Sequence, residues 1–204
     1  MIIIIDYGLG NLASIQNMLR KIDIESEITS NPKKIMMATK LILPGVGAFD
    51  HGMENLKKLK LIPAIEEQVL RKKVPILGIC LGMQLMTEKS EEGKLPGLGW
   101  IKGDTIKFSF KNKKLKIPHM GWNSVTVDKK HYLAKDLPRN SRFYFVHSYR
   151  VVLNDNRDNL LTTDYGGTFT SGFQRGNIMG VQFHPEKSHH FGMKLLENFG
   201  RAVC

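Results

Sequence analysis

The 204-residue sequence predicts an α/β fold, with a mostly parallel twisted sheet flanked by helices and an antiparallel β insert. Three observations support this prediction. Short apolar runs alternate with amphipathic stretches over the first 90 residues, which is the pattern of a doubly wound sheet. Residues 2–5 are apolar on both faces, as in a buried parallel strand. After Gly93, short runs separated by turns indicate antiparallel strands.

The first half predicts four strands joined by helices. In the first helix, Ile15, Leu19 and Ile22 share one face. Asn31 and Pro32 form a helix start signal, since Asn caps a helix and Pro fits its first turn. The predicted strands are 2–5, 24–29, 40–43 and 74–79; the predicted helices are 13–22, one from residue 32, and a region broken at Pro63 that ends near residue 73.

The second half predicts an insert rather than another domain, because residues 176–183 again have the composition of a core strand. The strands predicted for the insert are 101–110, 113–117, 122–127, 142–152 and 168–173. A helix over residues 189–203 closes the chain. Residues 1–204 are therefore predicted to form a single domain.

The composition is that of an ordinary globular protein, with 42% apolar and 24% charged residues. The net charge of +11 comes from scattered lysines without a nucleic-acid-binding motif. It indicates a solvated basic surface or, alternatively, a face for an acidic protein or a phosphorylated compound, rather than nucleic acid.

Cysteine usage and hydropathy bear on the cellular compartment. Cys80 and Cys204 do not make a disulfide framework. The sequence has no basic leader and no apolar run near the ~20 residues of a membrane helix. We therefore expect a cytoplasmic protein with one thiol free for chemistry and no contact with a membrane.

Cys80 lies in a Gly78-Ile79-Cys80-Leu81-Gly82 turn between a predicted strand and helix. This is the pattern of a nucleophile elbow with sulfur in place of oxygen. The helix N-terminus would favour a thiolate, and the Leu81 N–H could face a developing oxyanion. A cysteine simply buried at a strand end is the alternative.

A base and a carboxylate follow a later strand, at His184 and Glu186. A thiol nucleophile needs a base, and the base needs an orienting acid. Strand ends on one edge of a parallel sheet come together, so this pair could meet Cys80. Without Cys80, an exposed strand-end histidine would be the commoner interpretation. His119 and His147 are expected to be structural, and His189–His190 lacks a third metal ligand, so no metal site is predicted.

Glycines also follow the third strand, in Pro44-Gly45-Val46-Gly47. They allow unusual backbone angles and close approach to a ligand, and could supply a second oxyanion N–H. A plain turn is the alternative.

Together these motifs resemble the class I (triad) glutamine amidotransferases, which have a flavodoxin-like sheet. Further motifs are similar to the glutaminase subunits of imidazole glycerol phosphate synthases, and the likeness runs from residue 1 to the final helix. These motifs are residues 5–12, 44–47, 118–123, 145–149 and 185–188.

The resemblance implies roles. Cys80 forms a thioester with L-glutamine, His184 shuttles protons and Glu186 orients His184. No cofactor is implied. The oxyanion hole is implied at Val46 and Leu81, with a Gly45–Val46 peptide that turns on partner binding. The residues implied near glutamine are Gly47, Gln84, Ser148 and Tyr149. Those implied at the partner face, where core packing or a solvated surface is the alternative, are Trp122 and Lys187.

The resemblance also implies a heterodimer with a (β/α)8-barrel synthase (cyclase) subunit. The glutaminase would channel ammonia to that subunit, which forms imidazole glycerol phosphate and AICAR in histidine biosynthesis. Four alternatives remain open: ammonia supply for surface-polysaccharide sugar amination, an α/β-type hydrolase, a non-catalytic scaffold, and nucleic-acid binding.

Overall fold

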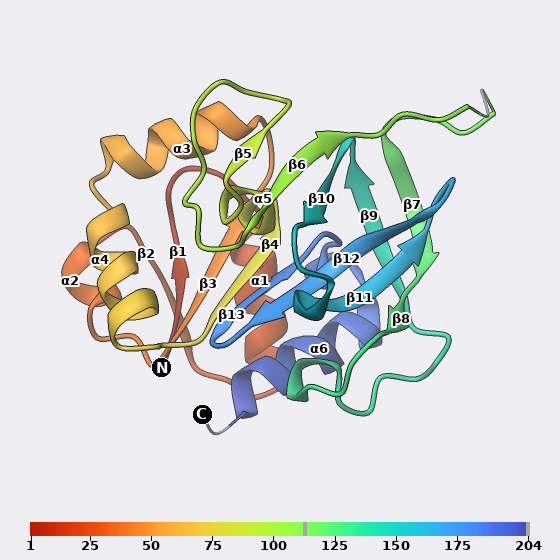
Figure 1. The fold of residues 1–204 in the computed structure, drawn as a ribbon. Coiled ribbons are helices and arrows are strands. Elements are labelled where there is room, and N and C mark those ends of the chain that lie inside the picture. The colour runs from red at the N-terminus through yellow and green to blue at the C-terminus, as the bar shows by residue number, and fades with distance from the viewer. Residues whose placement is uncertain (112–113, 203–204) are drawn as a thin grey trace.

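A computed structural model describes residues 1–111 and 114–202. Its main sheet runs in the order β2-β1-β3-β4-β13-β12-β10-β6-β5, with β11 and β8 attached beside β12 (Figure 1). The strands are β1 (Ile2–Ile5), β2 (Ser26–Thr29), β3 (Lys40–Gly45), β4 (Ile76–Cys80), β5 (Lys89–Ser90), β6 (Gly103–Lys107), β8 (Thr126–Val127), β10 (Tyr149–Leu153), β11 (Asn159–Asp164), β12 (Thr168–Arg175) and β13 (Ile178–Val181).

The sheet is parallel from β2 through β13 and antiparallel from β13 through β12 and β10 to β6. Strand β13 therefore joins the two halves, because it pairs with β4 on one side and β12 on the other. A separate two-stranded antiparallel sheet is formed by β7 (His119–Ser124) and β9 (Arg142–His147).

Helices cover both faces of the parallel strands (Figure 1). The helical segments are α1 (Leu12–Lys21), α2 (Pro32–Ile35), α3 (Phe49–Lys58), α4 (Ile62–Glu66), η1 (Glu67–Arg71), α5 (Leu81–Leu85), η2 (Tyr132–Ala134), η3 (Asn156–Asp158), η4 (Pro185–Lys187) and α6 (His189–Arg201). Alternation along β1 explains the layers: Ile3 packs into a core with α3 and α4, whereas Ile4 packs into a second core with α1 and α6.

The predicted fold class is confirmed, and several boundaries need correction. Residues 114–117, predicted within a strand, form a turn and loop, where the Tyr165 hydroxyl donates to the Lys116 carbonyl; Lys113 lies outside the described residues. The predicted strand 142–152 is two strands, because β9 pairs with β7 while β10 joins the main sheet.

Other differences have local causes. The helical break precedes Pro63, because this proline lies in the first turn of α4, where its missing N–H costs nothing. Strands β5 and β11 were not predicted. Asn31 caps α2 as predicted, since its side chain accepts a hydrogen bond from the Lys33 N–H. Within the part of the chain that the structure describes, no helix has the length and apolar character needed to cross a bilayer.

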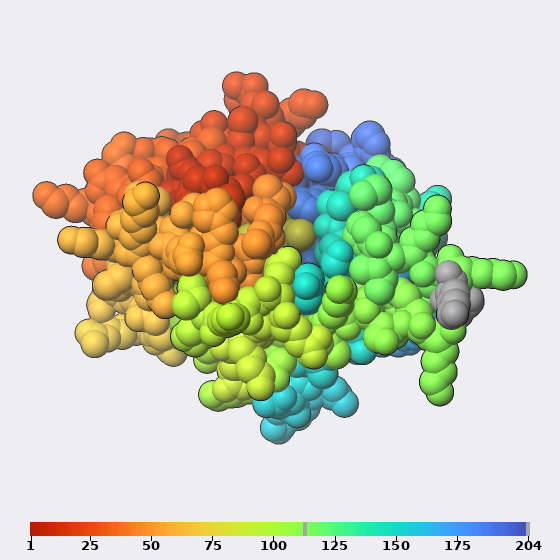
Figure 2. Space-filling model, turned by 90° about the horizontal axis from the view of Figure 1, so that it is seen from above, coloured from red at the N-terminus to blue at the C-terminus, as the bar shows by residue number. Residues whose placement is uncertain are grey.

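The carboxyl ends of β1, β3 and β4 lie at the upper edge of the sheet in Figure 1. Figure 2 shows this edge face-on, with a recess where the orange surface of the first half meets the cyan surface of the second. The predicted site residues come from strand ends and loops at this edge.

Candidate active site

Cys80 ends β4 and immediately precedes α5. Its backbone has φ 53° and ψ −108°, a conformation that non-glycine residues rarely adopt. The thiol is free, and the residue is only 7% exposed. This is the strained strand-to-helix turn that the Gly-x-Cys-x-Gly pattern predicts.

The flanking glycines are required by close backbone contacts. A Cβ on Gly82 would lie 1.8 Å from the Leu43 carbonyl oxygen, and one on Gly78 would lie 2.8 Å from the Gly82 backbone. A Cβ on Gly45 would lie 2.2 Å from the Tyr7 hydroxyl. The elbow is therefore packed directly against the end of β3.

His184 and Glu186 lie where the chain leaves β13. Nδ1 of His184 is 2.7 Å from Oε1 of Glu186, and both side chains are 1% exposed. Asn11 holds the same carboxylate oxygen, since its Nδ2 donates at 2.8 Å. Because a carboxylate accepts hydrogen bonds, the Glu186 contact assigns the proton of the neutral ring to Nδ1 and leaves Nε2 without a proton.

Nε2 of His184 is buried and has no hydrogen-bond partner among the described residues. Burial lowers the pKa of His184, but interactions with Cys80 and then Glu186 outweigh burial and raise it above the usual range. For Glu186, burial raises the pKa, but the bonds from His184 and Asn11 hold it below its usual value. The arrangement therefore favours a protonated His184 ring beside an ionised Glu186 carboxylate.

A cavity of about 370 Å³ opens beside Cys80 and His184. All six residues predicted for the oxyanion hole and glutamine binding line it: Val46, Gly47, Leu81, Gln84, Ser148 and Tyr149. Glu92, Pro118, Val146 and His147 complete the lining. Residues spread over much of the chain thus converge on one cleft.

Hydrogen bonds fix the wall of this cleft. The amide nitrogen of Gln84 donates to the Tyr149 carbonyl at 3.2 Å and to Gln182 at 3.0 Å. The same carbonyl lies 2.6 Å from Nδ1 of His147, whose Nε2 lies 3.0 Å from Nδ1 of His119. Since a carbonyl only accepts, each histidine carries its proton on Nδ1.

Burial favours the neutral form of His147 in the cleft wall and of His119 behind it. Burial lowers the pKa of His147 to about 3 and that of His119 to about 4. Their place in the hydrogen-bonded wall agrees with the structural role predicted for them.

The two residues predicted at a partner face lie on the surface. Trp122 on β7 is 39% exposed, and its ring stacks on His189 with centroids 5.2 Å apart. Lys187 is exposed, with Nζ 5.7 Å from the centroid of the Tyr144 ring. Trp122 is therefore an exposed residue and not part of the buried core.

Four site residues escaped the sequence analysis: Asn11, Glu92, Gln182 and Ser188. Asn11 and Ser188 lie in motifs that the sequence analysis singled out, but only contacts give them roles. Ser188 accepts a hydrogen bond from the Tyr144 N–H and donates one to the His184 carbonyl, which fixes the loop that carries His184. Glu92 follows an acidic run after α5 and could have been suspected from its charge.

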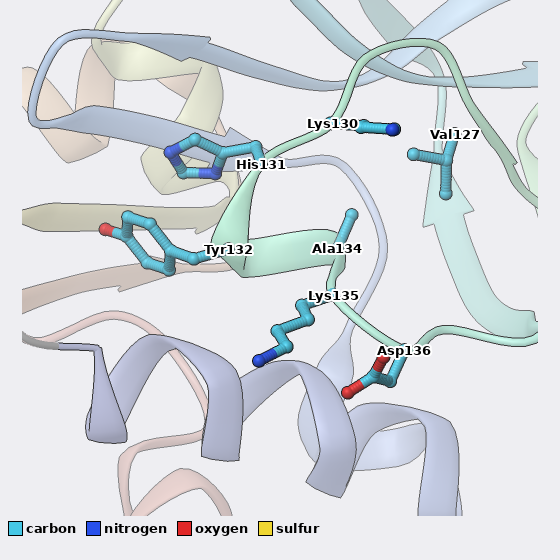
Figure 3. Close-up of a pocket in the computed structure, with 7 residues that line it drawn as sticks. All are labelled: Val127, Lys130, His131, Tyr132, Ala134, Lys135 and Asp136. Atoms are coloured by element: carbon cyan, nitrogen blue, oxygen red, sulfur yellow. The ribbon is translucent and has the colours of Figure 1, made fainter.

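A larger cavity, of about 550 Å³, shares no lining residue with this cleft (Figure 3). Its walls come from residues 127, 130–132 and 134–136. His131 is engaged there as a helix cap, since its Nδ1 accepts from the Leu133 N–H. Among the described residues, no group of three or more His, Cys, Asp or Glu side chains could hold a metal ion.

Comparison with known proteins agrees with this geometry. The family model described as "Glutamine amidotransferase class-I" matches residues 3–203. The chain belongs to the class-I glutamine amidotransferase family. This amidotransferase is 58% identical over 199 residues to "Imidazole glycerol phosphate synthase subunit HisH 2" of Methanococcus maripaludis, covering 98% of each chain. It is 49% identical to a protein of the same name from Pseudomonas aeruginosa, covering 100% of both.

Solved structures support the amidotransferase fold. One, "Structure of PurLQS from Thermotoga maritima", matches with a TM-score of 0.72 at 20% identity, covering 97% of this chain and 95% of that one. The glutaminase domain of Trypanosoma brucei CTPS matches with a TM-score of 0.66 at 15% identity, covering 100% of this chain and 94% of that one. At such identities the likeness concerns the fold alone.

Proposed function

We propose that this chain is the glutaminase subunit of an imidazole glycerol phosphate synthase, acting in histidine biosynthesis as a single domain in the cytoplasm. It hydrolyses L-glutamine to glutamate and delivers ammonia to a (β/α)8-barrel cyclase subunit. The observation that carries the proposal is the Cys80–His184–Glu186 constellation beside a cleft of about 370 Å³. The names of the two relatives above support the choice of synthase.

The proposed reaction begins with Cys80. Its sulfur attacks the side-chain amide carbon of glutamine, and the oxyanion that forms is stabilised by the N–H groups of Val46 and Leu81. The C–N bond then breaks, and the leaving nitrogen takes a proton from His184 and departs as ammonia. Water, deprotonated by His184, attacks the thioester, and glutamate leaves as the C–S bond breaks and the thiolate returns.

Substrate recognition is proposed for three further residues that line the cleft, Glu92, Ser148 and Tyr149. Glu92 lines the cleft, and its carboxylate would pair with the α-ammonium group of glutamine. Ser148 and Tyr149 also line the cleft, and Gln84 and His147 hold the Tyr149 carbonyl in place. Glu186 lies behind His184 and orients it rather than touching substrate.

The partner surface is proposed beside the cleft mouth. Four exposed apolar side chains form what we call the rim patch: Val46, Ile117, Met120 and Trp122. Lys187 is also exposed. Two of its members tie it to the cleft, because Val46 lines the cleft and Ile117 precedes the lining residue Pro118. Exposed large apolar side chains near a site are typical of protein interfaces.

Activation by the partner is proposed through the Gly45–Val46 peptide. Gly47 has φ 107°, and no atom lies within 4 Å of the position of its missing Cβ. Open space therefore lies on the Gly47 side of this peptide, whereas Gly45 is packed against Tyr7 and Leu81. A turn on the Gly47 side would bring the Val46 N–H toward the oxyanion when the partner contacts Val46.

The test is ammonia release from glutamine by the chain alone and with the barrel subunit. We expect slow release alone, strong stimulation by the partner, and none with a Cys80→Ser variant under either condition. Equal rates with and without the partner would refute the coupling. Rescue of a histidine auxotroph by the pair tests the acceptor pathway, and failure to rescue by an active pair would point to another acceptor.

A further inference from the structure

Gln182 is a buried amide next to the reactive sulfur. It follows β13 and lies two residues before His184, with 0% exposure. Its Nε2 lies 3.7 Å from Sγ of Cys80, within the range of an N–H···S contact. No step of the proposed reaction yet uses this side chain.

The orientation of the Gln182 amide is determined by its neighbours. Gln84 contacts the Tyr149 carbonyl, so the group it presents there is its NH₂. That same NH₂ reaches Oε1 of Gln182 at 3.0 Å. With its oxygen held by Gln84, Gln182 must direct its own NH₂ toward Cys80.

The sulfur has few other partners. Cys80 is 7% exposed, so water can stabilise a thiolate only partly, and a buried anion needs donors. The ionisable groups around it are His184 backed by Glu186, Tyr7 beneath the elbow, and Glu92 and His147 in the cleft wall. A neutral amide supplies a donor that keeps its own proton throughout the reaction.

We propose that Gln182 is a further catalytic residue of this glutaminase, donating a hydrogen bond to the Cys80 sulfur, with Gln84 as the residue that positions it. The inference rests on the proposed function, because it assigns the donor to the nucleophile of that reaction. The bond strengthens as the sulfur becomes an anion, so it favours the thiolate before attack and after hydrolysis.

The test is alkylation of Cys80 by iodoacetamide over a range of pH, using the chain alone and mass spectrometry of the Cys80 peptide. A Gln182→Met variant keeps the side-chain length but removes the donor. We expect alkylation in neutral solution to slow by about threefold to tenfold, with the pH midpoint of the rate profile moved upward. The matched control is Gln68→Met, another glutamine with 1% exposure, whose Nε2 donates to the Met36 carbonyl.

A Gln182→Met profile that coincides with those of the wild type and Gln68→Met would overturn the proposal. If this variant gives no cooperative thermal unfolding, Gln182→Glu replaces it, since a carboxylate can still accept from Gln84 but presents no donor to sulfur. A still slower alkylation is then expected, and an unchanged one overturns the proposal. The assay needs neither glutamine nor partner, so its failure is distinct from failure of the glutaminase function.

Discussion

At the scale of single residues, the site combines strained and unsatisfied groups that ordinary packing would exclude. Cys80 holds a positive φ, and the Tyr7 hydroxyl beneath it is fully buried with no hydrogen-bond partner among the described residues. Burial is the main cause that raises the pKa of Tyr7, with a smaller contribution from the charge of Cys80. Such costs are tolerated at functional sites because the surrounding contacts fix the geometry.

Removing the Tyr7 hydroxyl should therefore not destabilise the fold. We expect Tyr7→Phe to lower the free energy of unfolding by at most about 1 kcal/mol, because the hydroxyl that it removes has no hydrogen-bond partner among the described residues. Tyr7→Ala, which leaves a cavity, should cost about 3–5 kcal/mol. Urea unfolding of both variants measures this. A Tyr7→Phe cost near that of Tyr7→Ala would show that the hydroxyl makes a stabilising bond.

The sequence predicted some site residues and not others for a physical reason. Cys80 and His184 stand out because reactive side chains follow core strands beside glycine or proline. Gln182 lies in a buried apolar run, where an amide has no distinctive spacing, and its role depends on the fold bringing Gln84 and Cys80 to it. Asn11 likewise acquires its role only through contact with Glu186, 175 residues away.

At the scale of secondary-structure elements, close approach of backbones fixes the elbow. The β4–α5 turn packs on β3 so tightly that a side chain at Gly82 would collide with a carbonyl of β3. Glycine at this position is therefore required by the packing of the fold, as well as by the turn that presents Cys80.

Gly82→Ala should be strongly destabilising. Its Cβ would lie 1.8 Å from the Leu43 carbonyl oxygen. Because that oxygen belongs to the backbone and the backbone fixes the position of the Cβ, relief requires moving β3 or α5. We expect a loss above about 3 kcal/mol in urea unfolding. The control is Gly99→Ala, at φ 67° with nothing within 4 Å, for which only about 1–2 kcal/mol of backbone strain is expected. Equal losses would refute the steric explanation.

Element prediction worked where hydrophobic periodicity was strong. The first half has continuous apolar strands and amphipathic helices, so the order from β1 to α5 was predicted with only boundary errors, although the short strand β5 was missed. The insert was less predictable, because strand pairing decides its elements. Residues 142–152 were predicted as one strand, yet the chain passes from one sheet to the other at Ser148. The turn at 114–117 has strand-like alternation without a neighbouring strand to pair with in the described chain.

At the scale of the whole molecule, the buried His119–His147 pair links stability to pH. Both have a folded-state pKa, about 4 and about 3, below the unfolded value of about 6.5. The unfolded chain therefore takes up protons first as pH falls, so the stability contribution is full above about pH 6.5 and is lost as pH falls toward the folded values. Each histidine adds a slope of about 1.4 kcal/mol per pH unit in that window.

We expect this slope to shrink by about the contribution of one histidine in a His119→Gln variant, because glutamine does not titrate. The measurement is the urea midpoint from about pH 6.5 to about pH 5, above the range where most carboxylates titrate. His190→Gln, at an exposed position, is the control and should keep the wild-type slope. A His119→Gln slope equal to the wild type would contradict the buried neutral pair.

The rim patch should decide partner binding without affecting the chemistry of Cys80. Met120 is 61% exposed in this patch, whereas Met37, 80% exposed, follows α2 and precedes the amino end of β3. A charge introduced at an apolar interface must be desolvated without a partner, so Met120→Glu should weaken affinity for the barrel subunit at least about tenfold. Met37→Glu, with the same change of charge, should leave affinity unaltered, and both variants should alkylate at Cys80 like the wild type.

Titration calorimetry with the barrel subunit measures the affinities. If Met37→Glu weakened binding as much as Met120→Glu, the partner would recognise the overall basic charge rather than the patch.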